Sequence, residues 1–276
     1  MNKPSDTNVL KNLSGSIFLA GAGRMGGAML SGWISQGIDP SKIIVVEPSP
    51  SDDIRALETQ GVRLNPTDVS KASVLVLAVK PQMFRDAEPQ LKELVAPSAL
   101  VISVMAGLPI AKIEAALGGK VVRAMPNTPA AIGRGVTVAV AATDVTSAQR
   151  GIADALLRVT GLVEWIDDES LMDAVTAVSG SGPAYVFLLA EELARAGVAA
   201  GLTCELATRL ARETIAGSGE LLRRSELSSD VLRQNVTSPG GTTAAALEIL
   251  MGENGFKTLL ERAVKAAAKR SKELAN

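Results

Sequence analysis

The segment Asn235-Val-Thr-Ser-Pro-Gly-Gly-Thr-Thr243 combines glycines and hydroxyls just before an apolar-periodic run, Ala244 to Leu250. Pro239 and the adjoining Gly240-Gly241 must interrupt a helix, so a new helix is expected to begin at the run. The N–H groups at a helix N-terminus lack partners and carry a partial positive charge, which suits an anion. The segment indicates a cradle for a small carboxylate. The alternative is a glycine-rich turn with Thr as N-cap.

A second segment of the same kind is Ser179-Gly-Ser-Gly-Pro-Ala-Tyr185. It interrupts a helical pattern and is also expected to offer unpaired N–H groups and hydroxyls at a helix start. Tyr185 is a candidate proton donor, although a tyrosine on an apolar helix more often packs. The chain has no histidine. Since the usual acid–base group of neutral pH is missing, proton transfer must use Lys, Tyr, Thr, a carboxylate or water.

The segment Gly21-Ala-Gly-Arg-Met-Gly26 follows the first predicted strand and opens the first predicted helix. In a dinucleotide-binding βαβ unit such glycines allow a tight turn, close approach of a pyrophosphate and close packing of helix on strand. Glu47 ends the second predicted strand, roughly 20 residues further on, where an acidic residue binds the adenosine ribose. This order predicts NADH or NADPH binding. Glu47 favours NADH, but Ser49 and Ser51 offer hydroxyls to a 2′-phosphate, so the preference stays open.

Three further strand ends bring small or polar residues to the sheet edge where open α/β folds bind ligands. Lys80-Pro81 ends the third predicted strand, Met105-Ala-Gly107 follows the fourth, and Met125-Pro-Asn-Thr-Pro129 follows the fifth. Lys80 alone is also typical of an ordinary strand-end charge. Together these turns predict a ligand site along one edge of the sheet.

Alternating strand and helix patterns predict βαβ units and a parallel sheet with helices on both faces. The predicted strands are 16–20, 43–47, 74–78, 100–103, 121–124, 136–141 and 162–165, and the predicted helices between them are 25–36, 51–60, 83–95, 110–117 and 147–159. Only helical patterns follow, at 171–179, 184–196, 204–222, 227–234 and 243–274. These helices are apolar on more than one side, which predicts burial against a partner chain.

The predicted fold class is therefore α/β. An N-terminal Rossmann-type parallel-sheet domain is expected over residues 15–168 and an all-α dimerisation domain over residues 169–276. Residues 1–14 are polar and are predicted to form a disordered leader.

Composition argues against several classes of protein. The 28 Lys and Arg balance 29 Asp and Glu, and no basic stripe appears, which argues against nucleic acid or an anionic membrane as partner. No apolar run approaches the roughly 18 residues that span a bilayer. A single cysteine excludes an intrachain disulfide and a multi-cysteine zinc site, and no metal site is predicted. We expect a cytoplasmic protein.

Taken together, these segments resemble the pyrroline-5-carboxylate reductase family, from about Ile17 to Leu274. The marks of the resemblance are the five segments Gly21–Gly26, Ala78-Val-Lys-Pro81, Met125–Pro129, Ser179–Tyr185 and Asn235–Thr243, of which the last is the most family-specific. The resemblance implies reduction of 1-pyrroline-5-carboxylate to L-proline with NADPH or NADH. It also implies a homodimer whose helical domains interlock, with rings of dimers known in the family. The active site would then lie between one subunit's cofactor domain and helical segments at the dimer interface.

The resemblance also implies roles for single residues. Thr243 is the hydroxyl donor to the imine nitrogen and the catalytic candidate. The substrate-binding candidates are Glu226, Gly240, Gly241, Thr242, Thr243, Ser179, Gly180, Ser181 and Pro183. The cofactor-binding candidates, from motif and resemblance together, are Gly21, Ala22, Gly23, Arg24, Met25, Gly26, Glu47, Ser49, Asp68, Ala78, Val79, Lys80, Pro81, Met105, Ala106, Gly107 and Asn235.

Two departures from the family pattern concern the cofactor. Glu47-Pro-Ser-Pro50 stands where many members have Asn-Arg-Ser or Ser-Ser-Pro, which puts a preference for NADP in doubt. Asp68 stands where some members have an adenosine-contacting Asn.

Two other functions compete with the family assignment. A 3-hydroxyacid dehydrogenase of the β-hydroxyacid type would use a Lys on a long helix, but residues 171–196 contain none. A non-catalytic dinucleotide sensor would not need the SPGGTT and MPNTP segments, and both are intact.

Overall fold

The computed structural model describes residues 15–275. The predicted leader, residues 1–14, lies outside the described residues. The described residues up to Gly180, together with those from Ala268 on, form one compact unit, here called the sheet unit. Ser181–Ala267 form a second, the helical unit. The predicted domain boundary after residue 168 falls before this division, and residues 169–180 are grouped with the sheet unit.

The sheet unit is built on one eight-stranded sheet with the order β3-β2-β1-β4-β5-β6-β7-β8. The strands are β1 (Ile17–Ala20), β2 (Ile43–Val46), β3 (Arg63–Leu64), β4 (Ala72–Leu77), β5 (Val95–Ser103), β6 (Lys120–Met125), β7 (Gly135–Ala141) and β8 (Gly161–Trp165). From β1 the chain builds the sheet outward through β2 and β3, and then returns to β4 on the other side of β1. The direction of building thus reverses between β1 and β4, where open α/β sheets bind ligands.

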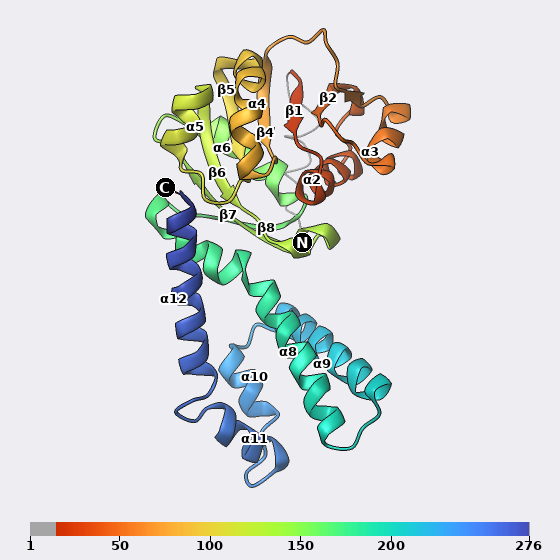
Figure 1. The fold of residues 1–276 in the computed structure, drawn as a ribbon, viewed down its shortest axis with the longest axis vertical. Helices are drawn as coiled ribbons and strands as arrows, with labels where there is room; N and C mark the ends of the chain where they lie inside the picture. The colour runs from red at the N-terminus through yellow and green to blue at the C-terminus, as the bar shows by residue number, and fades with distance from the viewer. Residues whose placement is uncertain (1–14, 276) are drawn as a thin grey trace. The chain divides into compact units, whose positions relative to one another are not determined.

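Helices cover both faces of the sheet, and each face has its own apolar core (Figure 1). The helices of this unit are α2 (Arg24–Ser35), α3 (Asp52–Ala56), α4 (Pro81–Leu94), α5 (Ile110–Leu117), α6 (Ser147–Arg158) and α7 (Met172–Val175). Ile17 and Leu19 face the core with α2 and α6, whereas Phe18 and Ala20 face the core with α4 and α5. This alternation along β1 follows from the two-residue period of a strand.

The predicted strands are all present, but the sheet is not wholly parallel. β6 and β7 pair antiparallel, with Met125 opposite Val138. Only a short link separates them, with the 3-10 turn Thr128–Ile132 inside it. A parallel return needs about a dozen residues or more, so a link of this length reverses the chain instead. The two-residue strand β3 was not predicted, because it is too short to show a periodic pattern.

The helical unit contains α8 (Gly182–Ala199), α9 (Cys204–Arg224), α10 (Ser229–Asn235), α11 (Thr242–Leu250) and most of α12 (Phe256–Ala275). The single helix predicted over 243–274 is wrong, since α11 ends before Met251 and α12 begins at Phe256. A Cβ on Gly255 would lie 2.1 Å from the Leu250 carbonyl oxygen, so the chain turns back on itself there. None of the helices among the described residues is both long and apolar enough to cross a membrane.

Candidate active site

The glycine-rich loop between β1 and α2 packs against the end of β4. Gly21 has a φ of 89°, and a Cβ there would lie 2.7 Å from the carbonyl oxygen of Ala78. A Cβ on Gly26 would lie 2.0 Å from the carbonyl oxygen of Gly21. Both glycines are therefore required by contacts within the protein, and they let α2 lie directly on the strands.

Gly23 is different, because no contact with the described residues requires a glycine there. Its φ is −69°, and a Cβ would meet no atom within 4 Å. Gly23 is also the N-cap residue of α2, which has no side-chain cap and no acidic residue in its first turn. Open space in front of an uncapped helix N-terminus fits a pyrophosphate, whose approach to the backbone a side chain would hinder. The loop thus fits the cofactor that its sequence predicts.

Glu47 reaches from the end of β2 to this loop. Its Oε2 accepts a hydrogen bond of 2.9 Å from the Ala22 N–H, and its Oε1 accepts one of 3.0 Å from the Ser49 N–H. The Asn65 amide holds the main chain of Glu47 on both sides, accepting from its N–H at 2.9 Å and donating to its C=O at 2.8 Å. Glu47 is therefore fixed beside the glycine-rich loop.

The ends of β4 and β5 carry the remaining cofactor candidates of this unit. Lys80 is exposed and forms the N-cap of α4, with Pro81 at the first helical position. Met105 is only 2% exposed, and its N–H donates to the Ser103 hydroxyl at 3.3 Å. The Met105 side chain thus belongs to the core. Of all cofactor candidates, Gly23, Arg24, Ser49, Asp68, Lys80, Pro81, Ala106 and Asn235 are exposed, Met25, Glu47, Ala78 and Val79 are half-buried, and Gly21, Ala22, Gly26, Met105 and Gly107 are buried.

Asn127 joins two of the predicted motifs. It lies after β6, and its Nδ2 donates to the carbonyl of Ser179 at 3.2 Å and to the Ser179 hydroxyl at 3.4 Å. Its Oδ1 accepts from the Val136 N–H at 2.9 Å. Gly180 lies against Met125, because a Cβ there would be 2.6 Å from the Met125 Cε. The MPNTP turn and the start of the SGSGP segment are therefore in contact within the sheet unit.

The helix α8 begins inside the SGSGP segment, as its sequence predicts, but the residues before it are helical as well. Thr176–Gly180 form a π-helical turn that follows α7, and Ser181 has a right-handed helical conformation before α8 begins. The chain therefore continues along a helical path with one widened turn. Such single widened turns are frequent at functional sites.

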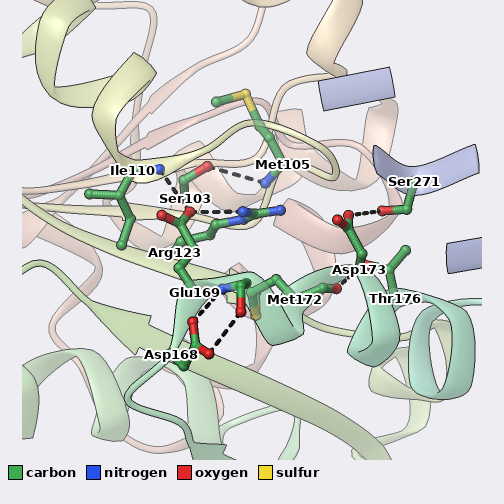
Figure 2. Close-up of polar contacts among 11 residues, drawn as sticks. Ser103, Met105, Ile110, Arg123, Asp168, Glu169, Met172, Asp173, Thr176 and Ser271 are labelled. Atoms are coloured by element: carbon green, nitrogen blue, oxygen red, sulfur yellow. Dashed lines mark hydrogen bonds and ion pairs between the residues drawn. The ribbon is translucent and has the colours of Figure 1, made fainter. Parts of the chain in front are cut away.

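An ion pair between the buried Arg123 and the half-buried Glu169 holds the segment before the π-helical turn against the sheet (Figure 2). The Arg123 side chain is 7% exposed and pairs with Glu169 Oε1 at 2.8 Å, and the same oxygen accepts from the Ile110 N–H at 2.9 Å. Ser271 in α12 donates to Asp173 Oδ1 at 2.7 Å. Next to Glu169, the Ser170 hydroxyl and N–H donate to the Asp168 carboxylate and hold its pKa below the ordinary value.

In the helical unit, the SPGGTT segment forms a tight turn followed by α11. The Gly241 N–H donates to the Ser238 carbonyl at 3.0 Å, and Gly240 has a φ of 70°. Proline second and a left-handed glycine third are the signature of a type II turn. Gly241 is the N-cap of α11, so the alternative of a Thr cap is wrong.

Thr242 and Thr243 thus take the first two positions of α11. The helix has neither a side-chain cap nor an acidic residue in its first turn. Of the other predicted residues, Asn235 ends α10, and Glu226 is exposed in the turn between α9 and α10. The uncapped start of α11 has a geometry that suits an anion.

Both the N-terminal and the C-terminal part of the chain match known protein families. Residues 169–274 match the family model described as pyrroline-5-carboxylate reductase dimerisation, and residues 16–107 match one described as NADP oxidoreductase coenzyme F420-dependent. The pyrroline-5-carboxylate reductase of Pseudomonas aeruginosa is 40% identical over 264 residues, which cover 94% of this chain and 96% of that protein. The chain belongs to the pyrroline-5-carboxylate reductase family.

Two solved structures of this family superpose on the chain. That of a pyrroline-5-carboxylate reductase from Coxiella burnetii is 37% identical with a TM-score of 0.87, covering 96% of this chain and 100% of that one. That of the Plasmodium falciparum enzyme with NADP bound is 32% identical with a TM-score of 0.78, covering 97% and 100%. The predicted family and fold class are confirmed, apart from the antiparallel strand pair.

Two residues that hold this reductase's motifs in place were missed by the sequence analysis. Asn65 orients Glu47, and Asn127 connects the MPNTP turn to Ser179. Asn127 stands inside a motif that was singled out, but its partner lies 52 residues away. Asn65 sits next to a proline, and its φ of 47° is the only positive value of a non-glycine among the described residues.

Proposed function

We propose that this chain reduces 1-pyrroline-5-carboxylate to L-proline with NADH or NADPH. The observation that carries the proposal is the start of α11, where a left-handed Gly240 turns Thr242 and Thr243 onto an uncapped helix N-terminus. The family membership supplies the reaction, since relatives at about 40% identity carry this enzyme's name.

The cofactor would be held by the glycine-rich loop, where the space beside Gly23 receives the pyrophosphate. When bound, the reduced nicotinamide supplies a hydride to the substrate. The backbone of Ala78 and Val79 lies against Gly21 of this loop, and the exposed Ala106 follows β5; all three are proposed to contact the cofactor through their backbone. The Met105 side chain is buried in the core, so we propose that only the backbone of Met105 lies near the cofactor.

The substrate would be held by the start of α11. Its carboxylate is proposed to lie against the Gly240-Gly241 turn and to accept a hydrogen bond from the Thr242 N–H, where the helix dipole favours a negative charge. The Thr243 hydroxyl is proposed to contact the imine nitrogen. Glu226 and the segment Ser179–Pro183 are proposed to contact the substrate as well.

This chemistry suits a chain without histidine. A cyclic imine is basic enough to bind in its protonated form, so the reaction needs orientation and charge complementarity more than a strong acid. A neutral hydroxyl is sufficient to hold the ring nitrogen while its carbon is reduced.

The helical unit is proposed to pair with that of a second copy of the chain. None of the 18 residues of α8 is buried, although Phe187, Leu188 and Leu193 are apolar. An exposed apolar helix face of this kind marks a protein interface. A homodimer is the simplest closed assembly, and a ring of dimers is the further assembly that we propose for higher concentrations.

Thr243→Ala tests the catalytic proposal. Loss of one hydrogen-bond donor at a reacting centre lowers turnover by about 100-fold. The measurement is oxidation of NADH and of NADPH by pyrroline-5-carboxylate, followed by absorbance, with a titration of cofactor binding to show that the cofactor site is intact.

Thr243→Ser is the matched control, because it keeps the hydroxyl and is expected to retain most of the activity. Unchanged kcat/KM in Thr243→Ala would remove Thr243 from the reaction. Oxidation of neither cofactor by the imine with the unaltered protein would instead favour a dinucleotide sensor.

A further inference from the structure

Glu47 is held from two sides in a way that leaves its carboxylate little freedom. Its two carboxylate oxygens accept from the N–H groups of Ala22 and Ser49 at 2.9 and 3.0 Å. Its main chain is paired with the Asn65 amide through both N–H and C=O. Asn65 itself is fixed, because its N–H donates to the Val45 carbonyl at 2.8 Å.

The position of this carboxylate decides what kind of ribose fits beside it. Ala22 belongs to the glycine-rich loop, so the carboxylate lies at the wall of the proposed cofactor site. A carboxylate only accepts hydrogen bonds. A ribose 2′-hydroxyl donates one, whereas a 2′-phosphate brings further acceptors and a negative charge.

The segment that follows Glu47 brings no positive charge to compensate. Asp52 and Asp53 occupy the first turn of α3, and residues 47–54 contain neither Lys nor Arg. The Ser51 hydroxyl accepts from the Ile54 N–H as the N-cap of α3, and although its O–H can still donate, it carries no charge that would balance a 2′-phosphate. A 2′-phosphate usually needs a nearby Arg, and the one in α3 is Arg55, in its last turn.

From these contacts we infer that this reductase prefers NADH to NADPH, with Glu47 as the specificity-determining residue and Asn65 as a positioning residue. This preference rests on the proposed function, which places the adenosine ribose of the cofactor at the end of β2. It deepens that function by naming which of the two cofactors the site takes.

Calorimetric titration of the full chain with NAD⁺ and with NADP⁺, in the absence of substrate, measures the preference directly. The unaltered protein is expected to bind NAD⁺ at least about tenfold more tightly, since like charges at close range in a partly solvated site cost at least that factor. Glu47→Gln keeps an acceptor for the Ala22 N–H but removes the charge. This variant is expected to bind NADP⁺ more tightly, so that the ratio of the NADP⁺ to the NAD⁺ dissociation constant falls by about tenfold or more.

Glu58→Gln is the matched control, because it removes the same charge from an exposed position in the 3-10 turn after α3. Its ratio of affinities is expected to equal that of the unaltered protein. Asn65→Gly removes the amide while allowing the positive φ, and it is expected to weaken NAD⁺ binding without tightening NADP⁺. A purely structural role for Asn65 would weaken both cofactors alike.

Three results would overturn the preference: equal or tighter binding of NADP⁺ by the unaltered protein, an unchanged ratio in Glu47→Gln, or binding of neither cofactor. Failure of the proposed function is a separate result. In that case NAD⁺ still binds more tightly, but pyrroline-5-carboxylate oxidises neither NADH nor NADPH. Conversely, efficient reduction with NADPH and tight NADP⁺ binding would keep the function and remove the preference.

Discussion

The two units of this chain are stabilised in different ways. In the sheet unit, side-chain contacts join distant parts of the sequence, as when the Trp33 Nε1–H donates to the Leu156 carbonyl at 2.9 Å. In the helical unit, the ion pairs join neighbours on one helix, as between Arg195 and Glu191 at 2.7 Å. On α9, Arg223 and Arg224 hydrogen-bond Glu220 and lower its pKa to about 2. One unit is thus closed by its own core, while the ion pairs described for the other are local and lie on an open apolar surface.

This difference indicates where each unit obtains its stability. Both faces of the sheet are covered by buried apolar clusters. By contrast, α8, α10 and α11 contain no buried residue. Local ion pairs on exposed helices contribute little. The helical unit therefore needs a second surface, and the proposed partner chain is what provides it.

The largest expected effect is on assembly, through Phe187→Ser in α8. Phe187 is 66% exposed in the single chain and is expected to be buried in the dimer. Burial of a Phe side chain contributes about 1.5–3 kcal/mol, and a symmetric dimer contains two copies. The dimer dissociation constant should therefore rise by about 100-fold or more, as measured by sedimentation over a range of concentrations.

Met83→Ser in α4 is the control for this experiment, because Met83 is 50% exposed on the sheet unit. It is expected to leave the dimer intact. An unchanged dissociation constant in Phe187→Ser would mean that α8 is not the interface. The open apolar surface of the helical unit would then not be explained by a partner chain at α8.

The next largest effect is the loss of unfolding free energy when an ion pair is broken, compared between the two units. Glu169→Ala leaves Arg123 buried without its partner, which should lower the free energy of unfolding by about 3 kcal/mol. Glu191→Ala removes one partner of Arg195, whose side chain is 65% exposed, and should cost less than about 1 kcal/mol. Urea unfolding followed by tryptophan fluorescence and circular dichroism measures both. Equal costs would mean that burial does not separate the two units as described.

The features that could be predicted from the sequence are those that depend on neighbours along the chain. Strand and helix periods, the glycine-rich loop and the acid at the end of β2 belong to this group. The break between α11 and α12 also belongs to it, since Gly252 and Gly255 mark this break in the sequence. The apolar sides of the last helices correctly indicated a surface that one chain leaves open.

What could not be predicted depends on contacts between distant residues. Asn127 bonds a residue 52 positions away, and the Arg123–Glu169 pair spans 46 positions. Neither the spacing nor the residue type of these side chains distinguishes them from exposed polar residues. The antiparallel β7 lies between these cases, because the shortness of its link to β6 was visible while its direction was taken from the general βαβ pattern.

The smallest effects concern glycines on helices of the two units. Gly32→Ala in α2 would place a Cβ 2.8 Å from the Val159 Cβ, and such overpacking should cost about 1–3 kcal/mol. Gly217→Ala in α9 would place a Cβ with no neighbouring atom of residues 15–275 within 4 Å. It should stabilise the single chain by about 0.5–1 kcal/mol, because alanine favours a helix. Thermal unfolding is measured at protein concentrations below and above the dimer dissociation constant, which separates the effect on the single chain from the effect on the dimer. If Gly217→Ala destabilises only the associated form, a partner backbone packs at that glycine; if it destabilises the isolated chain as well, this face of α9 is not open.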